Sequence, residues 1–157
     1  MEAIVLAIGN WPGAELLRES WAAYIFVNAA HILGIGLLLG SILPLDLRLL
    51  GLFRSAPLPV IGPFLLWTAR SGFLLALLMG LWLFSVKPDE YVENAAFQCK
   101  VALLVLALMN VVFQHRGASF RMALQGGKVH PRVRVLALIS ACLWLSVLVA
   151  GRWIGFL

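Results

Sequence analysis

The chain of 157 residues is too apolar for a water-soluble domain: 62% of its residues are hydrophobic, 12% are charged, and its mean hydropathy is +0.98. A soluble domain of this size cannot bury so much apolar surface, so the composition predicts a protein that lies in a lipid bilayer. The net charge of +5 is clustered between apolar runs, which indicates membrane orientation and argues against nucleic acid as a partner.

Residues 1–19 precede the first long apolar run. Trp11, Leu16 and Leu17 can form one apolar side of a helix in this segment. The pattern predicts a short interfacial helix, or two turns broken at Pro12, in front of the first span.

Four apolar stretches are long enough to cross a bilayer core of ~30 Å as helices. We predict spans over about residues 21–42, 64–86, 97–114 and 135–156. The sequence therefore predicts an all-α membrane protein with a single domain over residues 1–157, an antiparallel bundle of four transmembrane helices with a short N-terminal interfacial segment.

Prolines surround the connection between the first two spans. Pro44 lies near the end of the first span, and Leu43–Leu50 is expected to continue as a helical turn. The prolines that follow are expected to break regular structure before the second span; they are Pro57, Pro59 and Pro63.

Charge differs sharply between the two sides of the predicted bundle. The segment from Arg116 to Arg134 holds five basic residues and no acidic one. The first 19 residues carry three glutamates against one arginine, and residues 87–93 carry three acids against one lysine. The positive-inside rule therefore predicts that both termini face the periplasm or exterior and that the two basic loops face the cytoplasm.

His31 is the eleventh residue of the uncharged run Trp21–Leu45, so it is expected near the middle of the membrane. An ionisable residue at that depth is a functional hypothesis by default. On a helical wheel Asn28 and Gly34 fall on the same side as His31, whereas Gly36 and Gly40 fall on the opposite side. The first group predicts a site for a planar ligand, with Gly34 leaving space for its ring, and the second predicts close packing on another helix.

The candidate ligands of His31 are haem b, with His31 bound to the metal, and quinone. A haem that only passes electrons needs a second axial ligand. His115 is expected ~15–20 Å away along the membrane normal, too far to share the iron. The remaining candidates are a methionine, Met109 or Met79, a second copy of His31 in a homodimer, or a histidine from another membrane subunit. Met109 is alternatively a packing residue.

Two arginines are expected at the exterior face. Arg152 and Arg18 could bind haem propionates or a quinone head group. Arg152 is alternatively an interfacial anchor. His31 itself is alternatively a packing histidine with one hydrogen bond to Asn110 or to a carbonyl group.

Charged residues are also expected at the cytoplasmic edge. Arg70 falls inside the second span, where an arginine costs ~2.5–3.5 kcal/mol on insertion scales. Asp46 is its expected partner, with Arg48 beside it. The pattern favours structural pairing over a proton relay.

Motifs of self-sufficient enzymes are absent from the sequence. It contains no CxxC, CxxCH, HExxH, P-loop or nucleophile elbow. This absence favours a non-catalytic redox or accessory subunit.

The chain resembles an uncharacterised bacterial inner-membrane family of small four-helix proteins. The resemblance is carried by RESWAAYIFVNAAHILGIGLLLGSILPLDLRLLG, by LFSVKPDEYVENAAFQCKVALLVLALMNVVFQHR and by SACLWLSVLVAGRWIGF. The histidine-bearing first helix is more distantly similar to membrane cytochromes b and to copper-resistance membrane domains, which implies haem or metal handling by analogy.

These observations lead to one main hypothesis and two alternatives. The main hypothesis is an electron-transfer subunit that binds haem b or contacts quinone through His31 and exchanges electrons with a periplasmic redox protein. The first alternative is a cofactor-free accessory subunit that packs on a larger membrane complex through Gly36 and Gly40. The second is a small transporter or metal-handling channel that uses His31 and Asp46.

Overall fold

A computed structural model describes residues 8–156, and all regular structure in this part of the chain is helical. Four helices are long and apolar enough to cross a membrane, which confirms the predicted fold class. They are α3 (Trp21–Leu50), α4 (Leu58–Phe84), α6 (Ala95–Arg116) and α8 (Pro131–Trp153), the last extended by a 3-10 turn, η1 (Ile154–Phe156).

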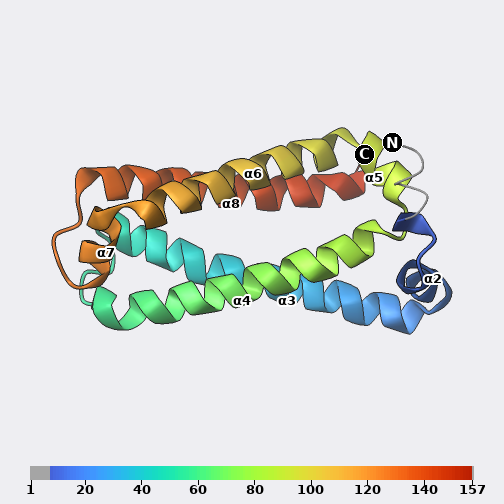
Figure 1. The fold of residues 1–157 in the computed structure, drawn as a ribbon, viewed down its shortest axis with the longest axis horizontal. Coiled ribbons are helices and arrows are strands. Elements are labelled where there is room, and N and C mark those ends of the chain that lie inside the picture. The colour runs from blue at the N-terminus through green and yellow to red at the C-terminus, as the bar shows by residue number, and fades with distance from the viewer. Residues whose placement is uncertain (1–7, 157) are drawn as a thin grey trace.

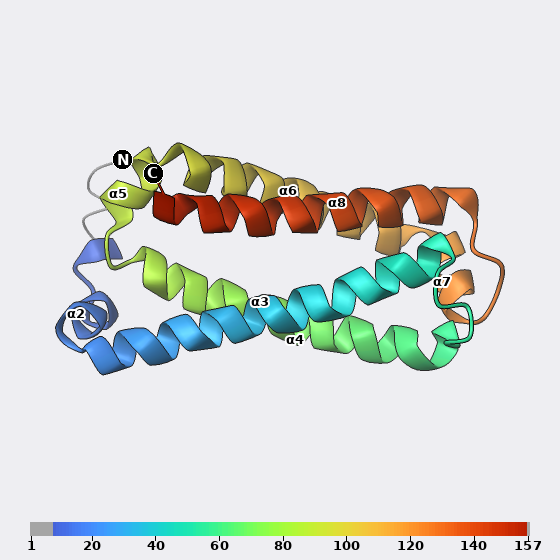
Figure 2. The ribbon, with the colours of Figure 1, turned by 180° about the vertical axis from the view of Figure 1, so that it is seen from behind.

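The four long helices form two antiparallel hairpins (Figures 1 and 2). α3 packs against α4 and α6 packs against α8, while the contact between α3 and α8 joins the two pairs. Glycines bring α3 and α4 together: a Cβ on Gly34 would lie 2.5 Å from the Ala76 nitrogen, and one on Gly72 would lie 2.6 Å from the Leu38 nitrogen. Backbone therefore contacts backbone at this crossing, as small residues permit in membranes.

α3 continues through Pro44 to Leu50, which confirms the helical continuation expected over Leu43–Leu50 and extends the span beyond residue 42. Pro44 removes one intrahelical hydrogen bond, the bond that would reach the Gly40 carbonyl. In a membrane the remaining backbone groups must still pair internally, so the helix continues instead of breaking. It ends at Gly51, whose φ of 107° lies in the left-handed region that glycine adopts freely.

The predicted break before the second span is confirmed for residues 51–57, which include Pro57, but not for Pro59 and Pro63. α4 begins at Leu58 and includes both Pro59 and Pro63. Pro59 occupies the first turn, where its missing N–H would have had no helical partner. Pro63 lies further inside and is accommodated as Pro44 is, so six residues assigned to the loop are helical.

Three short helices lie at the ends of the bundle: α2 (Pro12–Glu19), α5 (Pro88–Glu93) and α7 (Ala118–Leu124). The helical conformation predicted in front of the first span is confirmed for α2, while its part before residue 8 lies outside the described residues. α5 and α7 were expected as polar loops. α7 is helical because it has apolar residues to bury, and Phe120 and Ala123 lie in a core with Leu45 and Leu49.

We call the end of the bundle with α2 and α5 the acidic end, and the end with α7 and residues 51–57 the basic end. α2 is attached to the acidic end by side-chain hydrogen bonds. The Trp11 indole donates to Ser85 Oγ at 2.9 Å, the Trp82 indole donates to the Gly13 carbonyl at 2.8 Å, and Arg18 donates to the carbonyls of Gly9 and Val86.

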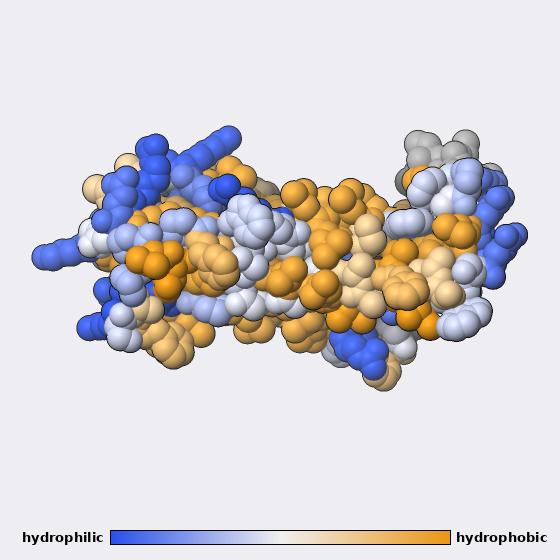
Figure 3. Space-filling view, turned by 90° about the horizontal axis from the view of Figure 1, so that it is seen from below, coloured by the Kyte–Doolittle hydropathy of each residue, from blue (hydrophilic) through white to orange (hydrophobic). Residues whose placement is uncertain are grey.

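The outer surface of the bundle is apolar between its two ends. Hydrophobic side chains cover most of the middle of the molecule, and hydrophilic ones gather towards both ends (Figure 3). Large side chains such as Phe26, Trp67 and Val60 are exposed there. Their exposure is expected for residues that contact lipid.

Candidate functional site

His31 lies at the contact between α3 and α4. Its Nδ1 is 2.7 Å from the Ala76 carbonyl oxygen. A carbonyl only accepts, so Nδ1 carries a proton and donates it. Of the two expected partners, a carbonyl is confirmed and Asn110 is not, because Asn110 donates to the Leu136 carbonyl on α8.

A glycine makes the space for the His31 ring. A Cβ on Gly80 would lie only 2.8 Å from His31 Cε1, so any side chain at this position would displace the imidazole. Nε2 has no hydrogen-bond partner among the described residues and is not enclosed by them. The bond to Ala76 therefore orients the ring and leaves Nε2 as the nitrogen that can bind a further group.

Lys100 is the charged residue associated with His31. It lies in the first turns of α6, is half-buried, and is close enough to His31 for their charges to interact. Its stem runs along Gly151 of α8, where a Cβ would lie 3.5 Å from Lys100 Nζ. No acidic side chain within residues 8–156 forms a salt bridge with it.

Lys100 was not predicted to lie near His31. The available signal was a glycine beside each of the two polar side chains, Gly80 beside His31 and Gly151 beside Lys100. This signal can be recognised only once the neighbouring helices are known.

The expected space beside Gly34 is absent. The α4 backbone occupies it, since the Ala76 nitrogen and Cα and the Gly72 oxygen all lie within 3.0 Å of where a Cβ would be. Gly34 is therefore a helix-packing residue. Asn28 is half-buried one turn before His31.

The expected helix-packing glycines face open space instead. A Cβ on Gly36 or on Gly40 would have no neighbour within 4 Å. Gly34 therefore packs within the chain, whereas Gly36 and Gly40 lie on its outer surface and pack on no helix among the described residues.

No hydrogen bond among the described residues joins His31 to the other predicted ligand residues. Met109 is 48% exposed on the surface of α6. The Arg152 guanidinium lies 4.8 Å from the centre of the Phe156 ring, which fits an anchor at the membrane surface. Arg18 bonds to main-chain carbonyls of Gly9 and Val86, so its guanidinium holds α2 in place.

His31 lies outside two cavities in the described part of the chain. One, near Asp46, has a volume of about 10 Å³, and the other, at the acidic end, has a volume of about 330 Å³. Two basic residues, Arg18 and Lys87, and two acidic residues, Asp89 and Glu90, line the larger cavity, so its lining has no excess of either charge.

A metal site built from several ligands is not formed. Within residues 8–156 no group of three or more His, Cys, Asp or Glu side chains comes together. His31 is a single nitrogen ligand, fewer than a protein metal site normally provides.

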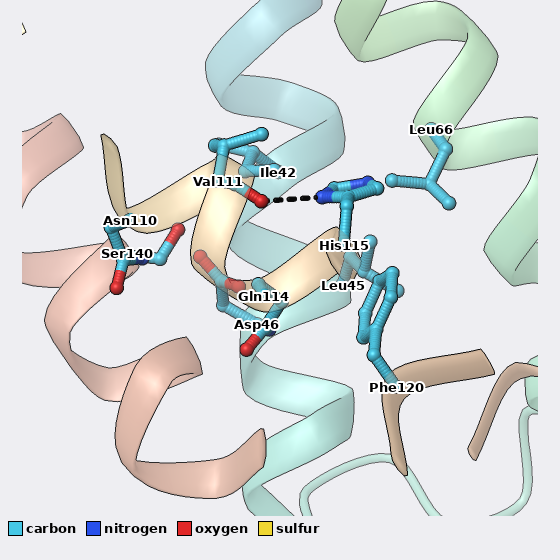
Figure 4. Close-up of a pocket in the computed structure, with 10 residues that line it drawn as sticks. All are labelled: Ile42, Leu45, Asp46, Leu66, Asn110, Val111, Gln114, His115, Phe120 and Ser140. Carbon is cyan, nitrogen blue, oxygen red and sulfur yellow. Dashed lines mark hydrogen bonds between the residues drawn. The ribbon is translucent and has the colours of Figure 1, made fainter. Parts of the chain in front are cut away.

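A second polar site, absent from the predictions, lies towards the basic end. Four buried polar residues line the smaller cavity: Asp46, Asn110, Gln114 and Ser140 (Figure 4). Asp46 is 2% exposed, and its Oδ2 has no hydrogen-bond partner among the described residues.

The predicted pairing of Asp46 with Arg70 is wrong. Arg70 is exposed on α4, and no salt bridge joins the two residues. Arg48 points to the following loop, where it donates to the carbonyls of Ala56 and Arg54. Asp46 instead faces α6 and α8, because α3 joins the second hairpin at this end of the bundle.

The pKa values of two side chains at the acidic end are raised. The hydrogen bond of 2.8 Å from Lys87 to Glu90 raises the pKa of the exposed Lys87 ammonium. Burial raises the pKa of the Tyr91 phenol, which packs with Phe84 and Phe97. Lys87 and Tyr91 therefore keep their usual protonation states, a cation and a neutral phenol, near neutral pH.

Helix number, apolar surface and buried polar side chains define a four-helix membrane protein. Residues 20–157 match the model of a family of unknown function, DUF6644, and the chain belongs to this family. Comparison with curated proteins and with solved structures gave no match.

Proposed function

We propose that this protein is a membrane redox subunit that contacts quinone at His31. The proposal depends on one observation: the bond from Nδ1 to the Ala76 carbonyl leaves Nε2 as a free acceptor at the surface of the helices. A quinol hydroxyl can donate to such a nitrogen. Lys100 would supply the complementary donor to a quinone oxygen.

Quinone is preferred to haem b as the ligand for two reasons. It needs no second axial ligand, and it reaches Nε2 from the lipid without requiring a cavity inside the chain. Electron transfer would then require a second redox centre on another membrane subunit or on a periplasmic redox protein. The subunit would have no catalytic residues of its own.

Binding of a short-chain quinol to the protein in lipid nanodiscs tests the proposal. We expect saturable binding that is weakened about tenfold in His31→Gln and in Lys100→Gln, because losing one hydrogen bond to a buried group removes ~1–1.5 kcal/mol. His130→Asn, which keeps a cap for α8, and the exposed Lys128→Gln are the matched controls. Equal binding by the wild type and both site variants would contradict the proposal.

The visible spectrum of the same preparation tests the haem alternative. A Soret band with split α and β bands on reduction, lost in His31→Ala, would replace quinone by haem b. Such a haem would lie between His31 and a group from a second copy or another subunit.

The accessory-subunit hypothesis is favoured by a separate observation, the open surface at Gly36 and Gly40. Two glycines one turn apart on an exposed helix face permit close approach of a partner helix. Loss of a partner from the purified native complex in Gly36→Leu would support it, and unchanged composition would contradict it.

For the location of the protein we propose the bacterial inner membrane, with the acidic end and both termini in the periplasm. The charge difference supports this orientation: the exposed residues of the basic end include Arg54, Arg116, Arg121 and Lys128, while α2 and α5 carry the exposed acids.

A further inference from the structure

The cavity near Asp46 contains two oxygen atoms that only accept hydrogen bonds. Asp46 Oδ2 and Gln114 Oε1 are both buried, and neither has a partner among residues 8–156. The residues themselves are 2% and 6% exposed. Such buried acceptors are normally paired, so a hydrogen-bond donor is expected at each of them.

The size of the cavity limits what that donor can be. Its volume is about 10 Å³, close to the smallest space that holds one water molecule. Asn110 and Ser140 line the same space, which gives a water molecule further polar partners (Figure 4). A larger ligand is excluded.

The charge of Asp46 also needs compensation. An ionised carboxylate enclosed by protein and lipid without a cation is strongly unfavourable, so such groups are paired or neutral. None of the basic residues around it forms a salt bridge with Asp46. Besides Asp46, one titratable residue lines the cavity, His115. The surrounding elements also carry arginines that do not line it, namely Arg48, Arg70, Arg116, Arg121, Arg132 and Arg134.

We propose that Asp46 is an exchangeable proton-binding site inside the bundle. Oδ2 binds one proton from water, the carboxyl group becomes neutral, and the new O–H donates to Gln114 Oε1, directly or through one water molecule. This single proton satisfies both unpaired oxygens and removes the buried charge. The site is separate from His31 and stands whether or not quinone binds there.

Access for the proton is provided towards the basic end. His115 lines the cavity and is half-buried at the end of α6, and its Nδ1 bonds to the Val111 carbonyl at 2.9 Å. Its other ring nitrogen is thus free to pass a proton between the cavity water and the bulk.

Carbon-13 NMR of the whole protein in lipid tests the proposal, because the chain has only two aspartates, Asp46 and Asp89. With Asp labelled at Cγ, we expect Asp46 to show the shift of a neutral carboxylic acid at neutral pH and the exposed Asp89 to show that of a carboxylate. Asp89→Asn assigns the signals. Two ionised carboxylates at neutral pH would overturn the proposal.

Three further measurements on the same sample separate a proton from other occupants. Transfer to D₂O should shift the Asp46 signal, and a signal that stays unchanged would mean that the proton is permanently trapped. Adding Na⁺ should have no effect, and a Na⁺-dependent shift would mean a cation site instead. Gln114→Leu should move the signal while the exposed Gln125→Leu should not, and equal spectra would overturn the pairing with Gln114.

Discussion

At the scale of single residues, glycines determine where polar side chains fit between the helices. Gly80 leaves space for the His31 ring, Gly151 lies along Lys100, and Gly34 brings the α4 backbone against α3. A polar side chain inside a membrane needs both a partner and a space, and here the missing Cβ of a neighbouring helix supplies the space.

Gly34→Ala is expected to destabilise the protein by about 1–3 kcal/mol, because the new methyl group would overlap the Ala76 backbone. Gly36→Ala, two residues away on the open face, should change stability by less than ~0.5 kcal/mol. Unfolding in mixed micelles of increasing SDS content measures both. Equal stabilities of the two variants would show that α3 and α4 do not meet at Gly34.

Gly80→Ala is expected to move the His31 ring and break its bond to the Ala76 carbonyl, since the methyl group would lie 2.8 Å from Cε1. Nitrogen-15 NMR of labelled histidine reports the change, because a single Nδ1–H tautomer gives two well-separated nitrogen shifts. In the variant the shifts should approach each other. Unchanged shifts would mean that the added methyl group does not displace the His31 ring.

Sequence reasoning at this scale located His31 within a spanning helix but did not predict its surroundings. Depth in an uncharged run is a property of one helix, so the place of His31 could be inferred from the sequence. The neighbourhood of Lys100, and of Asp46 with Gln114, depends on which faces of different helices meet. Helix periodicity alone does not specify that pairing.

At the scale of elements, the short helix α2 is attached to the bundle mainly by indole and guanidinium hydrogen bonds. Ala14 and Leu17 also bury their side chains, with exposed fractions of 0% and 3%. The hydrogen bonds connect Trp11, Gly13 and Arg18 with residues 82–86 at the acidic end of α4. α2 therefore covers the acidic ends of the first hairpin.

Trp82→Phe is expected to loosen α2, because it removes the bond of 2.8 Å to the Gly13 carbonyl. If the attachment of α2 is weakened by ~1 kcal/mol, the population of molecules with α2 detached rises about fivefold. Cleavage by a glutamate-specific protease at Glu15 and Glu19 measures this opening. Trp67→Phe, on the lipid-facing surface, is the control, and equal cleavage rates would contradict the attachment.

The extents of the elements show what hydropathy can and cannot predict. All four spans were located, because each contains a long apolar run. The beginning of the second span was misjudged at Pro59 and Pro63, since proline is a stronger helix breaker in water than in lipid. α7 was missed because its buried residues, Phe120 and Ala123, are few and are surrounded by basic ones.

At the scale of the whole molecule, the charge difference between the two ends predicts its orientation. In a variant without Cys99 and Cys142, a cysteine at the exposed Ser55 should react with a membrane-impermeant maleimide only after the cells are opened. A cysteine at the exposed Glu93 should react in intact cells. The reverse pattern would invert the proposed topology and place both termini in the cytoplasm.

The global arrangement was only partly predictable. Four antiparallel spans follow from short connections and from alternating loop charge. The division into two hairpins joined by α3 and α8 does not follow, because lipid-facing and buried apolar residues look alike in sequence. The buried polar residues of α3, α6 and α8 were a usable signal, since polar side chains tend to face other helices.

The close crossing of α3 and α4 has a consequence for how the protein is made. The N-terminal pair is complete once residue 84 has left the ribosome, and its glycine contacts require no residue from the later half. A translocon can therefore release this pair into lipid as a finished unit while α6 and α8 are still being synthesised. The nascent pair would then offer α3 as a template on which α8 docks last, in the order in which the ribosome delivers the chain.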